Sequence, residues 1–272
     1  MLRSLVLRDS TNRQNTVRTA TAARGEAETV IDPNKIRVIA FDLDGTLTQH
    51  RTPLPAQSRA LLDRLGERWK LLMVGAGQCS RIYRQMESYP IDIIGNYGMQ
   101  YCEFDRDLGA SVTVWDEHAP CDRESVERRI ELLRKEHGYT CFTGEGVEYH
   151  DSGCVTFPLL GTKADIRDKL AFDSDRKKRT AFYPEVCALF PEYTVFVGGS
   201  SSFDFAPLPY DKFYALDRYC LAKGLRHDEL VYVGDDCGPG GNDEAVFRSD
   251  FSCIRVDDYR RVGEALSAFQ NA

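Results

Sequence analysis

The sequence has no long apolar segment. None of its apolar runs approaches the roughly 20 residues that a helix needs to cross a bilayer, and the N-terminal region has no stretch long enough for a secretory signal. We therefore expect a cytoplasmic protein that neither spans nor binds a membrane.

Paired cysteines are missing as well. The nine cysteines are scattered singly along 272 residues, and no two of them have Cys-x-x-Cys spacing. An odd number of scattered cysteines in a chain of this size is typical of reduced thiols in a cytosolic enzyme. The spacing therefore supports neither a disulfide framework nor a zinc site.

Excess positive charge is the third absence. The 35 Lys and Arg residues are outnumbered by 42 Asp and Glu residues, which gives a net charge of -7. This balance argues against a nucleic-acid partner. It does not argue against a small anionic substrate, because a bound cation can reverse the charge of one site.

Residues 1–34 have no pattern that would form a core. Their arginines are spread among Thr, Asn, Ser and Ala with few acids. We expect a mobile tail. A transit peptide has a similar composition, but it ranks lower because no amphipathic repeat is clear.

Two acids follow the first apolar strand, which spans residues 35–41. Asp42 and Asp44 are one residue apart and precede Gly45, so side-chain alternation points both carboxylates the same way. Such a pair is costly without a cation, and Mg²⁺ is the hard cation that prefers oxygen ligands. Asp42 could then attack phosphorus while Asp44 handles the proton. The alternative is an ordinary strand-to-turn junction.

The region around these acids alternates strands with helices. Strands at 71–74 and 91–94 follow helices at 56–69 and 78–89. This alternation predicts a doubly wound, mainly parallel α/β sheet, in which ligands bind beyond the carboxyl ends of the strands. The acid pair and the glycine-rich turns at 75–77 and 95–98 fall at that edge.

A different pattern occupies residues 101–204. Short strands and helices, among them a convincing helix at 122–137, predict an inserted α+β module. The charged run at 173–179 is interpreted as a solvated loop. The alternation of strands and helices then resumes, and it ends with a helix at 259–269. We therefore assign residues 35–100 and 205–272 to one core.

A second acidic cluster follows the strand at 230–233. Asp235 and Asp236 end that strand, and Asn242 and Asp243 close the next loop. Two parallel strands that end in acids at one sheet edge can share a cation, whose ligands would be Asp42, the backbone carbonyl of Asp44 and Asp235. Asp236, Asn242 or Asp243 would complete or orient the shell. The alternative is a surface loop rich in turn residues.

Lys212 lies at the start of a predicted helix. A cation in a first turn is unfavourable for the helix dipole, which indicates another role, such as neutralising the phosphate and the nucleophile. A solvated lysine explains the position about as well.

These motifs together resemble the haloacid dehalogenase (HAD) superfamily. Residues 42–46 resemble its DxDGT signature, and Lys212 and residues 234–243 resemble its later motifs. Residues 198–204, 211–214 and 239–244 are similar to segments of eukaryotic-type phosphomannomutase. The resemblance implies a Rossmann-like HAD core with a large α/β cap, Asp42 as nucleophile and Asp44 as acid/base. It also implies that Ser202 and Asp204 contact the sugar.

The chain departs from this family at three places. The turn at 75–78 has no hydroxyl, so backbone N–H groups or Gln78 would have to hold phosphate. We accordingly place Thr46, Gly77 and Gln78 among the substrate-binding residues. Thr162 and His150 stand where mutase arginines grip a distal phosphate, and guanidinium is poorly replaced by other groups.

The leading hypothesis is a Mg²⁺-dependent phosphatase acting on a small phosphorylated metabolite, a sugar phosphate above all. The second is a phosphomannomutase-like mutase, in which Lys163, Arg167 or Arg176 would replace the missing arginines. The third is a non-catalytic sugar-phosphate binder, suggested by the missing hydroxyl. The cap is also considered as the interface of a homodimer.

Overall fold

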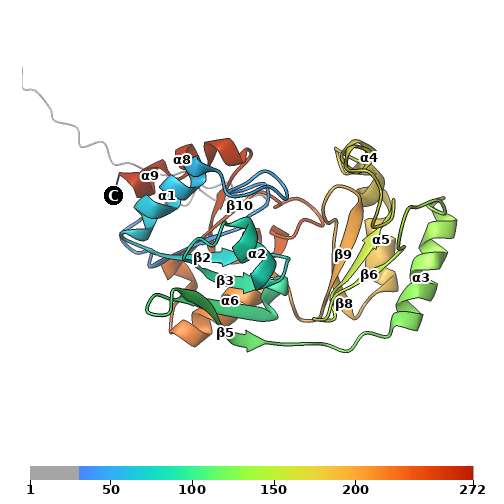
Figure 1. The fold of residues 1–272 in the computed structure, drawn as a ribbon, viewed down its shortest axis with the longest axis horizontal. Helices are drawn as coiled ribbons and strands as arrows, with labels where there is room; N and C mark the ends of the chain where they lie inside the picture. The colour runs from blue at the N-terminus through green and yellow to red at the C-terminus, as the bar shows by residue number, and fades with distance from the viewer. Residues whose placement is uncertain (1–30, 272) are drawn as a thin grey trace, which may run out of the picture.

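The computed structural model describes residues 31–271 and shows two bodies joined side by side (Figure 1). The larger one is built around a seven-stranded sheet and the smaller one around a four-stranded sheet. Most of the expected tail, residues 1–34, lies outside the described residues. Its last part is packed, since Ile31 is buried and the carbonyl of Pro33 accepts a bond from Trp69 Nε1 at 3.3 Å. The expected boundary at residue 34 is therefore too late.

The large sheet has the strand order β11-β10-β1-β2-β3-β4-β5. Five neighbouring strands are parallel, and they are β1 (Val38–Phe41), β2 (Lys70–Val74), β3 (Asp92–Gly95), β10 (Leu230–Gly234) and β11 (Ser252–Arg255). The antiparallel hairpin of β4 (Gln100–Asp105) and β5 (Ala110–Asp116) extends the β3 edge.

Helices cover both faces of this sheet. One face carries α1 (Ala56–Gly66), α2 (Cys79–Gln85), α8 (Val262–Ala265) and α9 (Ser267–Gln270), whereas the other carries α6 (Lys212–Lys223) and α7 (Glu244–Phe247). Alternate residues of β1 divide between the two layers, with Ile39 and Phe41 in one core and Val38 and Ala40 in the other. The predicted doubly wound, mainly parallel α/β class is confirmed.

Three element assignments are corrected. Residues 101–116 belong to the core sheet, where β4 pairs with β3 and β5 pairs with β4, so the inserted module does not begin at 101. The inserted module also extends past 204, because it includes the strand β9 (Ser202–Pro207). The expected helix at 259–269 is broken into a 3₁₀ turn (Tyr259–Arg261), α8 and α9. Alternation identifies an amphipathic strand, but it does not say which sheet the strand joins.

The smaller body, residues 117–207, is called the cap below. Its antiparallel sheet has the order β6 (Glu148–Tyr149), β7 (Val155–Pro158), β9 and β8 (Tyr193–Phe196). The helices α3 (Arg123–Glu136), α4 (Ile166–Phe172) and α5 (Lys177–Leu189) complete it, and α3 lies on the side away from the core (Figure 1). The predicted N-cap of α3 is confirmed, because Asp122 accepts a bond from Ser125 N.

The charged run at 173–179 is solvated at Ser174, Asp175, Lys177 and Lys178, as expected, but its two ends are buried. Asp173 and Arg179 are fully buried and form an ion pair of 2.8 Å. Arg179 also donates to the carbonyls of Gly198, Gly199 and Ser202. The run therefore ties the start of α5 to the turn before β9, a tertiary partnership that a charge pattern does not reveal.

The open face of the cap sheet lies against the core. Thr156, Asp204 and Phe196 are cross-strand neighbours and so share one face. Phe196 on that face stacks on Tyr97 of the core, with ring centroids 4.5 Å apart. The backbone N of Val197 donates to Gly240 O at 2.8 Å. These contacts place the cap over the loop that follows β10.

Within residues 31–271, no helix has both the length and the apolar character that a membrane crossing requires.

Candidate active site

The carboxyl ends of β1 and β10 lie side by side. Phe41 is in register with Val233, and the N–H of Asp42 donates to the Val233 carbonyl at 2.9 Å. The carboxylates of Asp42, Asp235 and Asp243 consequently offer oxygens that lie within 4.8 Å of one another. The expected meeting of the two acidic segments at one edge of the sheet is therefore confirmed.

Lys212 joins these acids from the first turn of α6. Its ammonium donates to Asp42 Oδ1 at 2.6 Å, to Asp243 Oδ1 at 2.7 Å and to Asn242 Oδ1 at 2.9 Å. The side chain has no exposed surface. Burial lowers the pKa of Lys212, but Asp243 and Asp42 outweigh it, so the pKa is raised and the ammonium stays charged. The alternative of a solvated lysine is excluded.

Asp243 fixes the shape of the loop between β10 and α7. Its Oδ1 accepts bonds from Lys212 and from the hydroxyl of Tyr232 at 2.5 Å. Its Oδ2 accepts the backbone N–H groups of Asp235 and Asp236 at 3.1 and 2.9 Å. Because four donors occupy this carboxylate, Asp243 acts mainly by orienting the loop.

Negative charge exceeds positive charge at this edge. Burial raises the pKa of the Asp42 carboxyl, Lys212 opposes the rise, and Asp243 and Asp235 add to it. Burial followed by Asp243 raises the pKa of Asp235. Three carboxylates face one ammonium, and Asp42 and Asp235 offer hard oxygen donors beside this unbalanced charge, which fits Mg²⁺.

Gly45 and Thr46 set the position of Asp235. Gly45 has φ +100°, and a Cβ there would lie 2.3 Å from Asp235 Oδ2, so only glycine leaves room for the carboxylate. The hydroxyl of Thr46 donates to Asp235 Oδ1 at 2.8 Å and is completely buried. The side chain of Thr46 thus orients Asp235.

Asp44 is turned toward α2 and lies outside the group of three carboxylates. Its Oδ1 accepts bonds from Gln85 Nε2 at 2.6 Å and from the N–H of Arg51 at 2.7 Å. Arg81 Nη1 lies 3.9 Å from Asp44 Oδ2. A quarter of the Asp44 side chain is exposed. We did not predict these three partners, because nothing in a helical or loop pattern marks them.

The sequence is similar to those of eukaryotic phosphomannomutases. Residues 144–258 match the model of the eukaryotic phosphomannomutase family. The phosphomannomutase of Encephalitozoon cuniculi is 25% identical over 260 residues, covering 84% of this chain and 93% of the relative. Human phosphomannomutase 1 is 26% identical over 257 residues, covering 87% and 90%.

Solved structures share the fold. The IMP-nucleotidase of Plasmodium falciparum has a TM-score of 0.63 at 14% identity, covering 87% of this chain and 68% of that one. A phosphatase of the HAD enzyme superfamily from Bacteroides thetaiotaomicron has a TM-score of 0.55 at 18% identity, covering 86% and 95%. This chain is therefore similar in sequence to phosphomannomutases and shares the fold of a HAD-superfamily phosphatase.

The cap presents polar side chains beside one carboxylate on the face that meets the core. Asp204 Oδ1 accepts a bond from Thr156 Oγ1 at 2.9 Å, and Thr156 Oγ1 lies 3.2 Å from His150 Nε2. Burial raises the pKa of Asp204. Ser202 Oγ donates to Gly198 O at 3.1 Å. Asp204 therefore faces the core, in keeping with its expected sugar contact, whereas Ser202 bonds its own loop.

Only one of the three cap cations considered above bonds to the core. Lys163 and Arg167 are exposed, and Arg167 pairs with Asp165 inside the cap. Arg176 instead pairs with the Asp236 carboxylate of the core. The other Asp236 oxygen accepts the N–H of Asn242 at 3.4 Å. Asp236 is therefore engaged with the cap and lies outside the group of three carboxylates.

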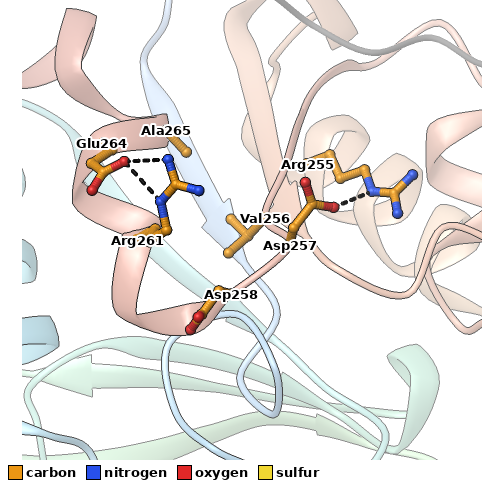
Figure 2. Close-up of a pocket in the computed structure, with 7 residues that line it drawn as sticks. All are labelled: Arg255, Val256, Asp257, Asp258, Arg261, Glu264 and Ala265. Atoms are coloured by element: carbon orange, nitrogen blue, oxygen red, sulfur yellow. Dashed lines mark hydrogen bonds and ion pairs between the residues drawn. The ribbon is translucent and has the colours of Figure 1, made fainter.

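A surface pocket beyond β11 is separate from this site. It is lined by residues 255–258, 261, 264 and 265 (Figure 2). Its charges are paired locally, Arg255 with Asp257 at 2.8 Å and Arg261 with Glu264 at 2.7 Å. None of the predicted site residues lines it.

Proposed function

We propose that this protein transfers a phosphoryl group from a small phosphorylated sugar to water, with Asp42 as the nucleophile. The observation that carries the proposal is the buried group of Asp42, Lys212 and Asp243 beside Asp235, at the carboxyl edge of the sheet. Such edges are where doubly wound sheets bind ligands.

The steps follow from the positions of two carboxylates. Asp42 attacks phosphorus in line and forms an aspartyl-phosphate, while Asp44 gives its proton to the leaving oxygen of the sugar. Asp44 then takes a proton from a water molecule, which attacks the same phosphorus. Inorganic phosphate leaves and Asp42 is restored. Gln85 and the N–H of Arg51 hold Asp44 in place during both transfers.

Lys212 favours the ionised form of the nucleophile. Burial favours the neutral form of Asp42, and the ammonium at 2.6 Å opposes it. Asp42, the backbone carbonyl of Asp44 and Asp235 would hold Mg²⁺. When bound, this ion offsets charge on the phosphoryl group. Asn242 is engaged by Lys212, and Asp236 by Arg176. We therefore assign these two residues to loop positioning and leave them out of the ion's ligand set.

We infer that the acceptor is water because the two cap positions at which the resemblance implies phosphate-binding arginines hold Thr162 and His150. Thr162 stands at one mutase position and its hydroxyl accepts the N–H of Glu145 at 2.9 Å. His150 stands at the other and is close to Thr156. A neutral, hydroxyl-rich part of the substrate suits these groups better than a second dianion does.

The second candidate is a sugar phosphomutase. The comparisons favour it, since the matched family and the two relatives described are phosphomannomutases. In this reaction the aspartyl-phosphate would be returned to a sugar hydroxyl, and Arg176 is the cap cation best placed to assist.

One incubation tests both candidates. Purified full-length protein is given mannose 1-phosphate, Mg²⁺ and a hexose bisphosphate activator. Release of inorganic phosphate indicates hydrolysis, and formation of mannose 6-phosphate indicates the mutase. Asp42→Asn should abolish either product while the protein remains folded, as circular dichroism checks. If neither product forms here or with a panel of phosphorylated metabolites, the protein is a binder and the proposal is wrong.

A further inference from the structure

Lys212 has no donor to spare for a phosphoryl group. An ammonium has three N–H donors, and all three are used by Asp42, Asn242 and Asp243. The side chain is also completely buried. A phosphoryl group can therefore gain a bond from Lys212 only if one of these bonds is given up. The turn at 75–78 offers no hydroxyl in its place.

A second cation lies beside Asp44. Arg81 Nη1 is 3.9 Å from Asp44 Oδ2 and donates to Gln85 Oε1 at 3.0 Å. Gln85 in turn donates to Asp44 at 2.6 Å. The same glutamine thus fixes the position of the acid/base and of the arginine. Because 42% of the Arg81 side chain is exposed, its remaining donors can reach a ligand.

Gly77 makes room for this arginine. A Cβ at Gly77 would lie 2.2 Å from Arg81 Nε and 2.3 Å from Arg81 Nη2, so the guanidinium lies against the bare backbone. The φ of Gly77 is outside the left-handed region, so the turn itself does not need a glycine. A side chain at this position would displace Arg81, and the two residues therefore form one unit.

We infer that Arg81 binds the phosphoryl group, in place of the hydroxyl that residues 75–78 lack. The inference rests on the proposed function, because it assumes that phosphate is held between Asp42 and Asp44. A guanidinium can donate two parallel N–H bonds to phosphate oxygens. Because Asp44 serves the leaving oxygen, the place of Arg81 next to Asp44 suits bonds to non-bridging oxygens of the same phosphoryl group.

Calorimetric titration with inorganic phosphate in the presence of Mg²⁺ tests the inference on the full chain. Charge-assisted hydrogen bonds lost from Arg81→Gln should weaken phosphate binding about tenfold to a hundredfold. Arg81→Lys should fall in between, because it keeps the charge and loses the planar fork. Arg84→Gln is the matched control, since Arg84 is an exposed arginine on the same helix and should bind as the wild type does.

A hydroxyl introduced at position 77 gives a second test of phosphate binding. Gly77→Ser alone should weaken phosphate binding, because its Cβ displaces the guanidinium. In an Arg81→Ala background the same serine has the room that Arg81 occupied, and it should recover part of the lost affinity. A structural role for Arg81 predicts no such recovery. Thermal unfolding confirms that each variant is folded.

The outcomes separate this inference from the proposed function. If the wild type releases phosphate from a sugar phosphate and Arg81→Gln binds inorganic phosphate equally well, the inference is overturned. If the wild type binds phosphate through Arg81 and neither hydrolyses nor isomerises any sugar phosphate, the proposed function fails and the inference stands.

Discussion

Replacing Lys212 by methionine tests how the buried charges are balanced. The change removes an ammonium that has no exposed surface, and it leaves Asp42 and Asp243 with bonds that Lys212 no longer donates. Breaking a buried pair by deleting one partner costs about 3–5 kcal/mol. Since proteins are typically stable by about 5–15 kcal/mol, a large part of the unfolding free energy should be lost.

The loss should depend on pH in a defined direction. Without Lys212, the pKa of Asp42 is raised further, because Lys212 is the group that opposes the effect of burial. A carboxyl whose folded pKa exceeds its unfolded value destabilises the fold increasingly as pH rises through the folded pKa. The difference between variant and wild type should therefore be small near pH 4 and largest above neutrality.

Urea unfolding at several pH values, in EDTA to exclude divalent cations, measures this difference. Lys223→Met is the control, since Lys223 pairs with Glu103 at a partly exposed site where about 1 kcal/mol or less is expected. If Lys212→Met loses no more stability than Lys223→Met, or if its loss is the same at every pH, the reasoning about the buried charges is wrong.

Three further changes follow from single contacts. Gly45→Ala places a Cβ against Asp235 in a left-handed turn, so it should lower the unfolding free energy by about 1–3 kcal/mol and reduce Mg²⁺-dependent turnover. Gly109→Ala is the control, because its Cβ meets nothing, and an equal loss of turnover there would argue against the clash. Arg176→Glu should raise KM by loosening the cap, and Asp236→Lys in the same chain should restore it; no recovery would exclude pairing. Burial lowers the pKa of His227, but its carboxylate partners raise it by more, so the net pKa is raised. The stabilisation from His227 is therefore complete below pH 6.5 and is lost as pH rises through the raised pKa. The unfolding free energy of His227→Gln, measured in urea, should differ from that of the wild type at pH 6 and differ less at pH 8.5.

Much of the core was predictable because its signals are local. An apolar strand that ends in acids identifies both β1 and β10, and parallel strands necessarily place these ends at one edge. Asp42 and Asp235 could therefore be paired across almost 200 positions. The helix cap at Asp122 was equally visible, because capping depends on residues a few positions apart.

The partners of these residues were not predictable. The Asp173–Arg179 pair is indistinguishable in sequence from an exposed charged run, and it is buried only because the turn before β9 closes over it. The roles of Gln85 and Arg81 depend on how α2 lies against the Asp44 turn. The hairpin at 100–116 alternates as strands in either domain would, so its sheet could not be assigned.

By itself the sequence determined the fold class and the acids that meet at the sheet edge, because side-chain alternation and strand direction are properties of short segments. The tertiary structure alone decided what each charged group is bonded to. It engages all donors of Lys212, turns Asp44 toward α2 and places Arg176 on Asp236. The physical reason is that the energy of a charge depends on burial and on partners a few ångströms away, and neither is encoded by neighbours in the chain.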